Sequence, residues 1–284
     1  MAQDLDVDLE LIVVDNGSTD GTAEYLAAAA ETSRRPIVTV RLDSNLGPAA
    51  RSAGIDVAGG DYIAFTDSDC EPDPGWLRAA LAAFDRPDVG IVQGRTEAAH
   101  DKAPLFSHYI VTDRLDGSFS TSNIVYRRQA IADLRFDASC IYWEDTDFGW
   151  RVFEKGWRAV FAPAAVVRHE VVPVSPLRWV TWPRHFQNYP QKAARYPGFR
   201  KHLFLGVWVS PMSLCFELAL AGVALARWNP AALLLGVPYV VQFARTRGLK
   251  GRFPPAKVAA HVAWDAVTLA SLLAGSVRNR SVVL

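Results

Sequence analysis

Residues 9–22 read LELIVVDNGSTDGT, and residues 61–70 read DYIAFTDSDC. Each stretch is a short apolar run that ends in acidic and small polar residues, as a buried strand does where it leaves a sheet. Further apolar runs, at residues 37–42 and 89–94, alternate with segments of helical composition at residues 22–31, 48–58 and 74–84. This alternation is typical of βαβ units on a parallel sheet, so we expect an α/β fold in the first part of the chain.

The composition is that of a globular chain, since half of its 284 residues are hydrophobic. Thirty basic and thirty acidic side chains balance, which argues against a protein that holds nucleic acid, because such a protein needs a basic surface. The three cysteines, Cys70, Cys140 and Cys215, are far apart in the sequence. Their spacing indicates neither a disulfide framework nor a zinc motif, and it favours a reducing, cytosolic environment.

The last third of the sequence predicts membrane-associated helices. Residues 203–226 carry one charge, Glu217, and are long enough to span a bilayer, which takes about 20 residues. Residues 230–244 and 258–277 are two further candidate spans. Before them, residues 176–202 mix Trp and Tyr with Arg and Lys, as an interfacial segment does. The alternatives are a buried helical subdomain and a soluble surface helix.

Charge predicts the orientation of these helices. The N-terminus is acidic and lacks the basic and then apolar pattern of a secretory signal. Basic residues gather between positions 245 and 257. If the first two segments cross a cell membrane, that loop lies on the same side as residues 1–202, and the positive-inside rule makes this side cytoplasmic.

Three acidic segments are candidates for chemistry. Asp15 and Asn16 end the first apolar run, where an open α/β sheet binds ligands and where a carboxylate can accept from a base or a ribose; an ordinary strand-to-helix turn uses the same residue types. Asp67 and Asp69 end the run at residues 61–67. Carboxylates two residues apart on an extended backbone point the same way, which suits a divalent cation.

The third segment is WEDTDFGWR at residues 143–151, where Glu144, Asp145 and Asp147 lie at the start of an expected helix. Acidic side chains in the first turn of a helix interact favourably with the helix dipole. Three acids within four residues nevertheless exceed what helix capping requires. A carboxylate there can serve as a general base for an attacking hydroxyl. His169 follows an expected strand at residues 158–163, and a lone histidine is more often structural than a ligand.

Together these segments resemble the inverting family 2 glycosyltransferases with the GT-A fold. The resemblance lies in LIVVDNGSTDGT, in the stretch at residues 43–77, in STSNIVYRR at 120–128 and in the stretch at 143–169. It implies a GT-A catalytic domain with a mixed sheet over residues 1–175, an interfacial linker at 176–202 and a membrane region at 203–284.

The resemblance also implies roles for individual residues. Asp15, Asn16, Arg51 and Asp67 would contact the nucleotide-diphosphate sugar. Asp69, with Asp67 and His169, would bind Mg2+ or Mn2+. Asp145 matches the catalytic base of the family, with Glu144 beside it.

Two departures from the family pattern stand out. Members normally open with a strand resembling VSVVIPTYN well before the VVD segment, whereas only eight residues precede Leu9. The GT-A sheet is therefore expected to lack its usual first strand, either because the true start lies upstream of Met1 or because the chain is shortened and its nucleotide pocket is incomplete. Ser52 stands where the family prefers Asn, beside Arg51.

The expected function is metal-dependent inverting transfer of a sugar from a nucleotide-diphosphate donor to a glycan or lipid-linked acceptor. The partners are then the donor, the acceptor and the membrane, with no nucleic acid. Two alternatives remain: a catalytically impaired protein that binds nucleotide sugar as a scaffold, and a sugar nucleotidyltransferase. The second would need a Gly-rich basic loop near the N-terminus, which the sequence does not contain.

Overall fold

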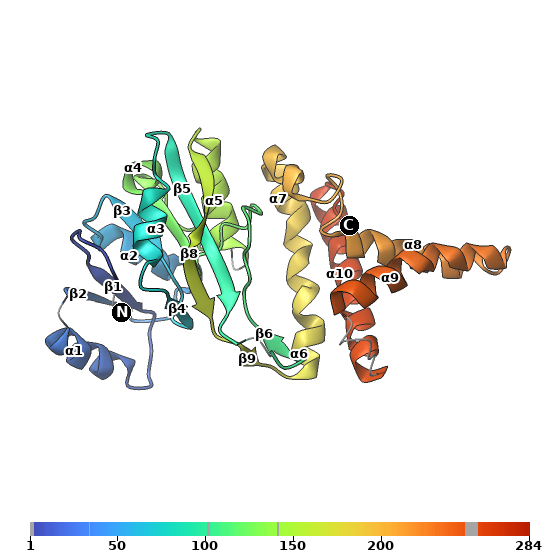
Figure 1. Ribbon diagram of the computed structural model, residues 1–284, viewed down its shortest axis with the longest axis horizontal. Coiled ribbons are helices and arrows are strands. Elements are labelled where there is room, and N and C mark those ends of the chain that lie inside the picture. The colour runs from blue at the N-terminus through green and yellow to red at the C-terminus, as the bar shows by residue number, and fades with distance from the viewer. Residues whose placement is uncertain (1–2, 34, 101–102, 141, 248–254) are drawn as a thin grey trace. The chain divides into compact units, whose positions relative to one another are not determined.

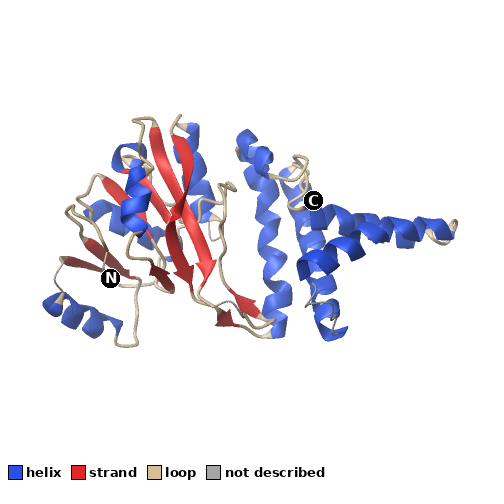
Figure 2. Ribbon diagram, in the orientation of Figure 1, coloured by secondary structure: helices blue, strands red, loops and turns tan. Residues whose placement is uncertain are grey.

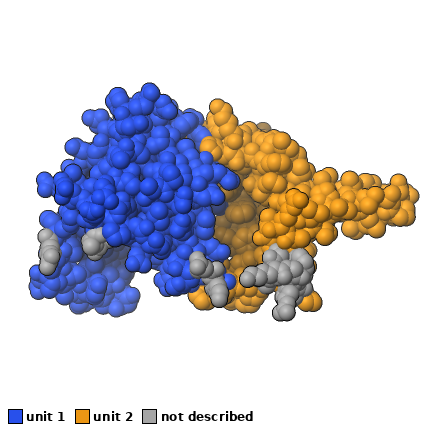
Figure 3. Space-filling model, in the orientation of Figure 1, with its two compact units in different colours: residues 1–103, 109–171 blue, residues 104–108, 172–284 orange. Residues whose placement is uncertain are grey.

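The structure is a computed structural model that describes residues 3–33, 35–100, 103–140, 142–247 and 255–284. The chain forms two compact units, coloured separately in Figure 3. Unit 1 contains residues 1–103 and 109–171, and unit 2 contains residues 104–108 and 172–284.

Unit 1 is an α/β domain (Figures 1 and 2). In chain order its elements are β1 (Leu11–Asp15), α1 (Thr22–Thr32), β2 (Ile37–Arg41), the short 3-10 helix η1 (Gly47–Ala49), α2 (Ala50–Val57), β3 (Tyr62–Phe65), β4 (Cys70–Pro72), α3 (Trp76–Ala82), β5 (Val89–Ala98), β7 (Ile124–Arg127), α4 (Arg128–Ile131), α5 (Glu144–Glu154) and β8 (Arg158–His169).

The first three elements form one βαβ unit, as the alternation predicts. β1 and β2 pair in parallel in a two-stranded sheet, with Leu11 opposite Ile37 and Asp15 opposite Arg41. The helix that joins them begins after Gly21, whose φ of 85° is a left-handed conformation that glycine adopts without a steric cost.

The larger sheet is mixed, with strand order β3-β7-β5-β8-β4. β5 pairs in parallel with β8, whereas β3 with β7, β7 with β5, and β4 with β8 are antiparallel. The expectation of a parallel sheet, drawn from the alternation of strands and helices, is therefore wrong for most of this sheet. Alternation does not determine which strands pair. The mixed sheet implied by the family resemblance is present.

Helices cover both faces of this sheet. Val92 and Val125 are partners in the β5–β7 register and belong to a buried cluster with Trp76 and Leu77 of α3. The neighbouring pair, Ile91 and Tyr126, points to the opposite face, where the Tyr126 ring meets Phe148 of α5 edge to face at 5.2 Å. The sheet is thus the middle of three layers, which fixes α5 against the strands that carry the candidate site.

β8 is longer than expected. The predicted strand at residues 158–163 continues to His169, because the β5–β8 register shifts between Gly94 and Arg95, whose partners are Ala162 and Val166. This bulge takes up Pro163, a residue that otherwise interrupts a strand. His169 is therefore the last residue of β8 rather than part of a following loop.

Unit 2 is mainly helical. Its elements are β6 (Ser107–His108), β9 (Val172–Pro173), α6 (Pro176–Thr181), η2 (Trp182–Asn188), α7 (Tyr189–Arg195), η3 (Pro197–His202), α8 (Pro211–Leu225), η4 (Pro230–Gly236), α9 (Val237–Arg247) and α10 (Pro255–Asn279).

Three apolar segments of unit 2 differ in helix length. The segment at 203–226 contains the 15-residue α8, which begins at Pro211 after the capping side chain of Ser210, so the eight residues before Pro211 are not part of it. η4 and α9 cover the segment at 230–244. In the described part of the chain, α10 is the one helix with the length and apolar composition needed to cross a membrane.

Candidate active site

The acidic loop between β3 and β4 carries Asp67 and Asp69. The backbone N–H of Cys70 donates to the Asp67 carbonyl oxygen at 3.1 Å, which closes a tight turn. β4 then pairs with the end of β8, with Cys70 directly opposite His169. This antiparallel pairing is what brings His169, a hundred residues further along the chain, to the acidic loop.

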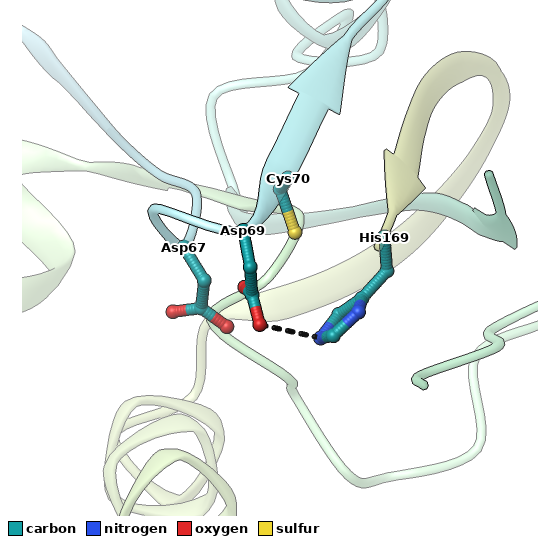
Figure 4. A group of neighbouring side chains, drawn as sticks. All are labelled: Asp67, Asp69, Cys70 and His169. Atoms are coloured by element: carbon teal, nitrogen blue, oxygen red, sulfur yellow. Dashed lines mark ion pairs between the residues drawn. The ribbon is translucent and has the colours of Figure 1, made fainter. Parts of the chain in front are cut away.

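His169 is held in a defined orientation (Figure 4). The side chain is buried, with a relative exposure of 2%, and its Nδ1 lies 2.8 Å from the Glu170 carbonyl oxygen. Because a carbonyl oxygen only accepts, Nδ1 carries the proton in this contact and Nε2 faces the Asp69 carboxylate at 3.6 Å. A histidine fixed through one nitrogen in this way presents the other as a metal ligand.

Ligand atoms of Asp67, Asp69, Cys70 and His169 all lie within 4.8 Å of one another. Two carboxylates and an imidazole suit a divalent cation such as Mn2+, and oxygen donors suit Mg2+. Among the described residues, the side chains of Asp67, Asp69 and His169 therefore fit the divalent cation that the sequence predicts. Desolvation raises the pKa of the Cys70 thiol to about 11.

Arg51 joins the acidic loop to the start of α5. From α2, its Nη2 contacts Asp67 Oδ1 at 3.2 Å and its Nη1 contacts Glu144 Oε1 at 3.0 Å. Burial alone would lower the pKa of Arg51, but the carboxylates of Asp67 and Glu144 outweigh it and raise the pKa above its usual value. Arg51 thus stays charged between two acids.

Ser52, at the position where the family prefers Asn, has a structural role. Its Oγ accepts from the backbone N–H of Phe136 at 2.9 Å. That hydrogen bond ties α2 to the segment before α5.

Asp145 follows Glu144 in the first turn of α5 and is half-buried. Desolvation by the surrounding protein and the neighbouring Glu144 charge raise the pKa of Asp145 to about 7. A carboxyl that titrates near neutral pH has the basicity needed by a general base. Asp147 is different, because it is buried and forms an ion pair with Arg151 at 2.9 Å, one helical turn later.

A loop that the sequence analysis did not identify fixes this turn of α5. Thr146 Oγ1 donates to the Ser118 carbonyl oxygen at 2.7 Å, and Trp150 Nε1 donates to the Gly117 carbonyl oxygen at 3.0 Å. Phe119, at a left-handed φ of 52°, packs against the backbone of Gly149 so closely that an added Cβ would lie 2.3 Å from the ring. The one available signal was the glycine inside a helix otherwise rich in bulky residues.

Asp15 and Asn16 shape a second loop. Asp15, at the end of β1, is buried, and its Oδ1 accepts from the Ser18 N–H at 2.9 Å. Hydrogen bonds from Ser18 lower its pKa. Asn16 accepts from Leu46 N–H at 2.8 Å. These contacts agree with the turn interpretation. Asp15 Oδ2 forms an ion pair with Arg41 Nη1 of β2 at 3.6 Å, and it has no hydrogen-bond partner within the described residues.

The structure therefore brings together most of the residues singled out in the sequence. Asp67, Asp69 and His169 form one cluster, and Arg51 links Asp67 to Glu144 beside Asp145. Asp15 and Asn16 lie on the separate two-stranded sheet and its loop.

Part of the chain is similar in sequence to known glycosyltransferases. Residues 2–139 match the model of the family described as "Glycosyl transferase family 2". The pre-mycofactocin glycosyltransferase of Mycobacterium tuberculosis is 31% identical over 186 residues, covering 57% of this chain and 37% of that protein. The amylovoran biosynthesis glycosyltransferase AmsB of Erwinia amylovora is 28% identical over 183 residues, covering 57% of this chain and 60% of AmsB. The chain thus spans less than two thirds of the length of these relatives.

Among solved structures, the mannosyltransferase PcManGT from Pyrobaculum calidifontis, determined with GDP-Man and Mn2+, superposes with a TM-score of 0.54 at 21% identity. The match covers 95% of this chain and 77% of PcManGT. It shows a shared fold. With the match of residues 2–139 to the family model, it leads to one conclusion: the chain has a GT-A-like glycosyltransferase fold.

Proposed function

We propose that the chain is a divalent-metal-dependent inverting glycosyltransferase that moves a sugar from a nucleotide-diphosphate donor to a hydroxyl of a membrane-bound glycan or lipid-linked acceptor. The carrying observation is the double ion pair of Arg51, which joins Asp67 of the candidate metal cluster to Glu144, the neighbour of Asp145. One side chain thereby links a candidate metal ligand to the residue next to the candidate base.

The donor half of the site is assigned to residues around the acidic loop. Asp69, Asp67 and His169 would hold Mg2+ or Mn2+, which when bound neutralises negative charge on the leaving diphosphate. Arg51 supplies a fixed positive charge beside Asp67 for the phosphates. Asp15 and Asn16 would meet the base or ribose, and Oδ2 of Asp15, which pairs with Arg41 but accepts no hydrogen bond, would accept one from a donor hydroxyl or N–H.

The acceptor half is assigned to α5. The acceptor oxygen attacks the anomeric carbon from the face opposite the diphosphate, so a new C–O bond forms as the bond to the diphosphate oxygen breaks. Asp145 takes the hydroxyl proton, and its elevated pKa suits that role. One displacement of this kind inverts the anomeric centre, as in the hydrolases that use a single attack.

Membrane attachment is assigned to unit 2. α10 has a mean hydropathy of 1.4 over a window of which only 28% is buried. The hairpin formed by α8, η4 and α9 exposes large apolar side chains, with Val223, Leu234 and Val240 at least 66% exposed. Asp265, an acid within α10, is buried and pairs with Arg247 at 2.7 Å and 2.8 Å. Apolar side chains outside and a paired charge inside are what lipid requires.

The orientation follows from charge. Arg245 and Arg247 end α9, and Lys257 lies in the first turn of α10; residues 248–254, which contain the other basic positions of this loop, lie outside the described residues. Under the positive-inside rule this joint, and with it the catalytic domain, lies on the cytoplasmic side of the cell membrane. Nucleotide sugars are made there. The amylovoran relative supports a cell-envelope glycan as the acceptor class.

The test is sugar transfer from nucleotide sugars to extracted membranes and polyprenyl phosphate, with the wild-type chain, Asp145→Asn and Asp69→Ala. Transfer by the wild-type chain is expected. Asp145→Asn should lose at least a hundredfold, since removal of a general base costs about 10²–10⁴-fold, and Asp69→Ala should lose at least tenfold, since changes around a metal site cost about 10–100-fold. Full activity of either variant would overturn the corresponding assignment. Donor binding without turnover by the wild-type chain would favour a scaffold protein instead.

A second assay tests attachment. The full chain should co-float with vesicles of mixed neutral and anionic phospholipid, and Val223→Lys combined with Leu234→Lys should reduce the floating fraction. A matched control places lysine at Ala27 and Ala30, two exposed positions of α1 in unit 1. Equal flotation of all three proteins would contradict insertion of the hairpin.

A further inference from the structure

Cys70 is the fourth side chain of the acidic-loop cluster, and nothing in the reaction proposed above uses it. We propose that Cys70 is a sulfur ligand for a thiophilic divalent cation, Zn2+ above all, which occupies the same site with Asp67, Asp69 and His169. The proposal deepens the proposed function, since it concerns the metal site of that reaction. It predicts that Zn2+ displaces Mn2+ and blocks donor binding.

The strand register puts Cys70 in place. Cys70 and His169 are direct cross-strand partners in the antiparallel β4–β8 pair, so their side chains leave the sheet on the same face. Figure 4 shows the thiol projecting from β4 on the side of His169. Each of the four residues offers one ligand atom: the Cys70 sulfur, a His169 ring nitrogen, and one carboxylate oxygen each from Asp67 and Asp69. These four atoms lie within 4.8 Å of one another, close enough for small side-chain rotations to bring them to one ion.

The donor set selects the metal. Thiolate and imidazole are ligands that Zn2+ and Co2+ prefer, whereas Mg2+ takes oxygen ligands. Zn2+ binds sulfur at about 2.3 Å and nitrogen or oxygen at about 2.0–2.2 Å, most often with four tetrahedral ligands. The cluster offers four. On binding, the Cys70 thiol gives its proton to solvent and its sulfur takes the ion.

Four protein ligands have a functional consequence. A catalytic metal site keeps one position open for water or substrate, while a site with four protein ligands is closed. With Mn2+ on the two carboxylates and His169, positions remain for diphosphate oxygens. With Zn2+ also on Cys70, a tetrahedral ion has none left, so donor binding is lost.

The experiment uses the full chain with Cys140→Ser and Cys215→Ala, which leaves Cys70 as the one thiol. Titration with Co2+ should produce a near-ultraviolet sulfur-to-cobalt charge-transfer band together with the visible bands of a tetrahedral ion. Adding Cys70→Ser should remove the charge-transfer band and weaken Zn2+ binding by at least about tenfold, because even outer partners of metal ligands change affinity by about 10–100-fold. Mn2+ affinity should change by less than about threefold.

Three results would overturn the inference: a cobalt spectrum without the sulfur band, equal Zn2+ affinity with and without Cys70→Ser, or a chain that binds neither Co2+ nor Zn2+. A second measurement covers the case in which Cys70→Ser misfolds. In the chain that keeps Cys70 as its one thiol, saturating Zn2+ should slow the labelling of Cys70 by iodoacetamide at least about tenfold. An unchanged labelling rate would refute the inference. The proposed function fails separately, since a chain without transfer in Mn2+ can still show the sulfur band.

Discussion

Replacing Glu144 by Gln should move the pH dependence of transfer to lower pH without abolishing it. Desolvation, and after it the Glu144 charge, raise the pKa of Asp145 from 3.8 to about 7. A base accepts a proton only when ionised, so kcat/KM should rise with pH through that value in the wild-type enzyme. The substitution leaves desolvation in place but removes the second cause, so the pKa of Asp145 should fall by about one unit.

The size of the effect follows from the ionised fraction. At a pH of about 5, a carboxyl of pKa about 7 is ionised in about 1% of molecules, and one of pKa about 6 in about 9%. Relative to its own alkaline plateau, Glu144→Gln should therefore show a kcat/KM about ninefold higher than the wild type at this pH. The two normalised profiles should coincide at alkaline pH.

The assay is initial transfer rates across the pH range, with saturating Mn2+ and subsaturating donor and acceptor. Glu154→Gln, at the exposed far end of α5, is the matched control and should leave the profile unmoved. Arg51→Met should shift the profile the other way, because Arg51 lowers the pKa of Asp145. A Glu144→Gln profile that does not move, or moves to higher pH, would refute the coupling between these two carboxyls.

Three further predictions follow. At pH values above neutral, Asp145→Asn should raise Tm by about 2–4 °C for each kcal/mol by which it relieves the cost of burying a charged carboxylate. Because the pKa of Asp145 is raised in the folded state, the native carboxyl opposes folding increasingly as pH rises from 3.8 through about 7. No gain in Tm is expected below that pH range. Asp69→Ala and His169→Ala should each weaken Mn2+ binding at least about tenfold by calorimetry, and EDTA should abolish transfer; metal-independent transfer would contradict this. Gly149→Ala should lower Tm and activity together through the clash with Phe119, at a cost of about 1–3 kcal/mol, and Phe119→Ala in the same chain should restore part of the Tm.

The sequence was sufficient for the elements whose pattern is local. β1, α1 and β2 follow from apolar runs and turn residues, and the acidic ends of β1 and β3 lie where the pattern put them. Strand pairing is not local: β3 pairs with β7 across about sixty residues, and nothing in the alternation of strands and helices specifies that partner. The extension of β8 to His169 was missed because a bulge, not a regular ladder, accommodates Pro163.

The candidate site shows the same limit. Asp67, Asp69, Asp145 and His169 were identified by residue type, position and family resemblance. Their proximity depends on the cross-strand pairing of Cys70 with His169 and on the double ion pair of Arg51. Both are tertiary contacts between distant segments. The fixing of α5 by Phe119 could not be anticipated, since a left-handed φ at a phenylalanine is strained and persists only where packing enforces it.

The most direct test of the metal-dependent donor site is calorimetric titration of UDP, GDP and dTDP into the wild-type chain and Asp69→Ala, with and without Mn2+. The account predicts that at least one nucleotide binds the wild-type chain in Mn2+ and that EDTA or Asp69→Ala removes most of this affinity. Binding of equal strength without metal, or unchanged in Asp69→Ala, would contradict it.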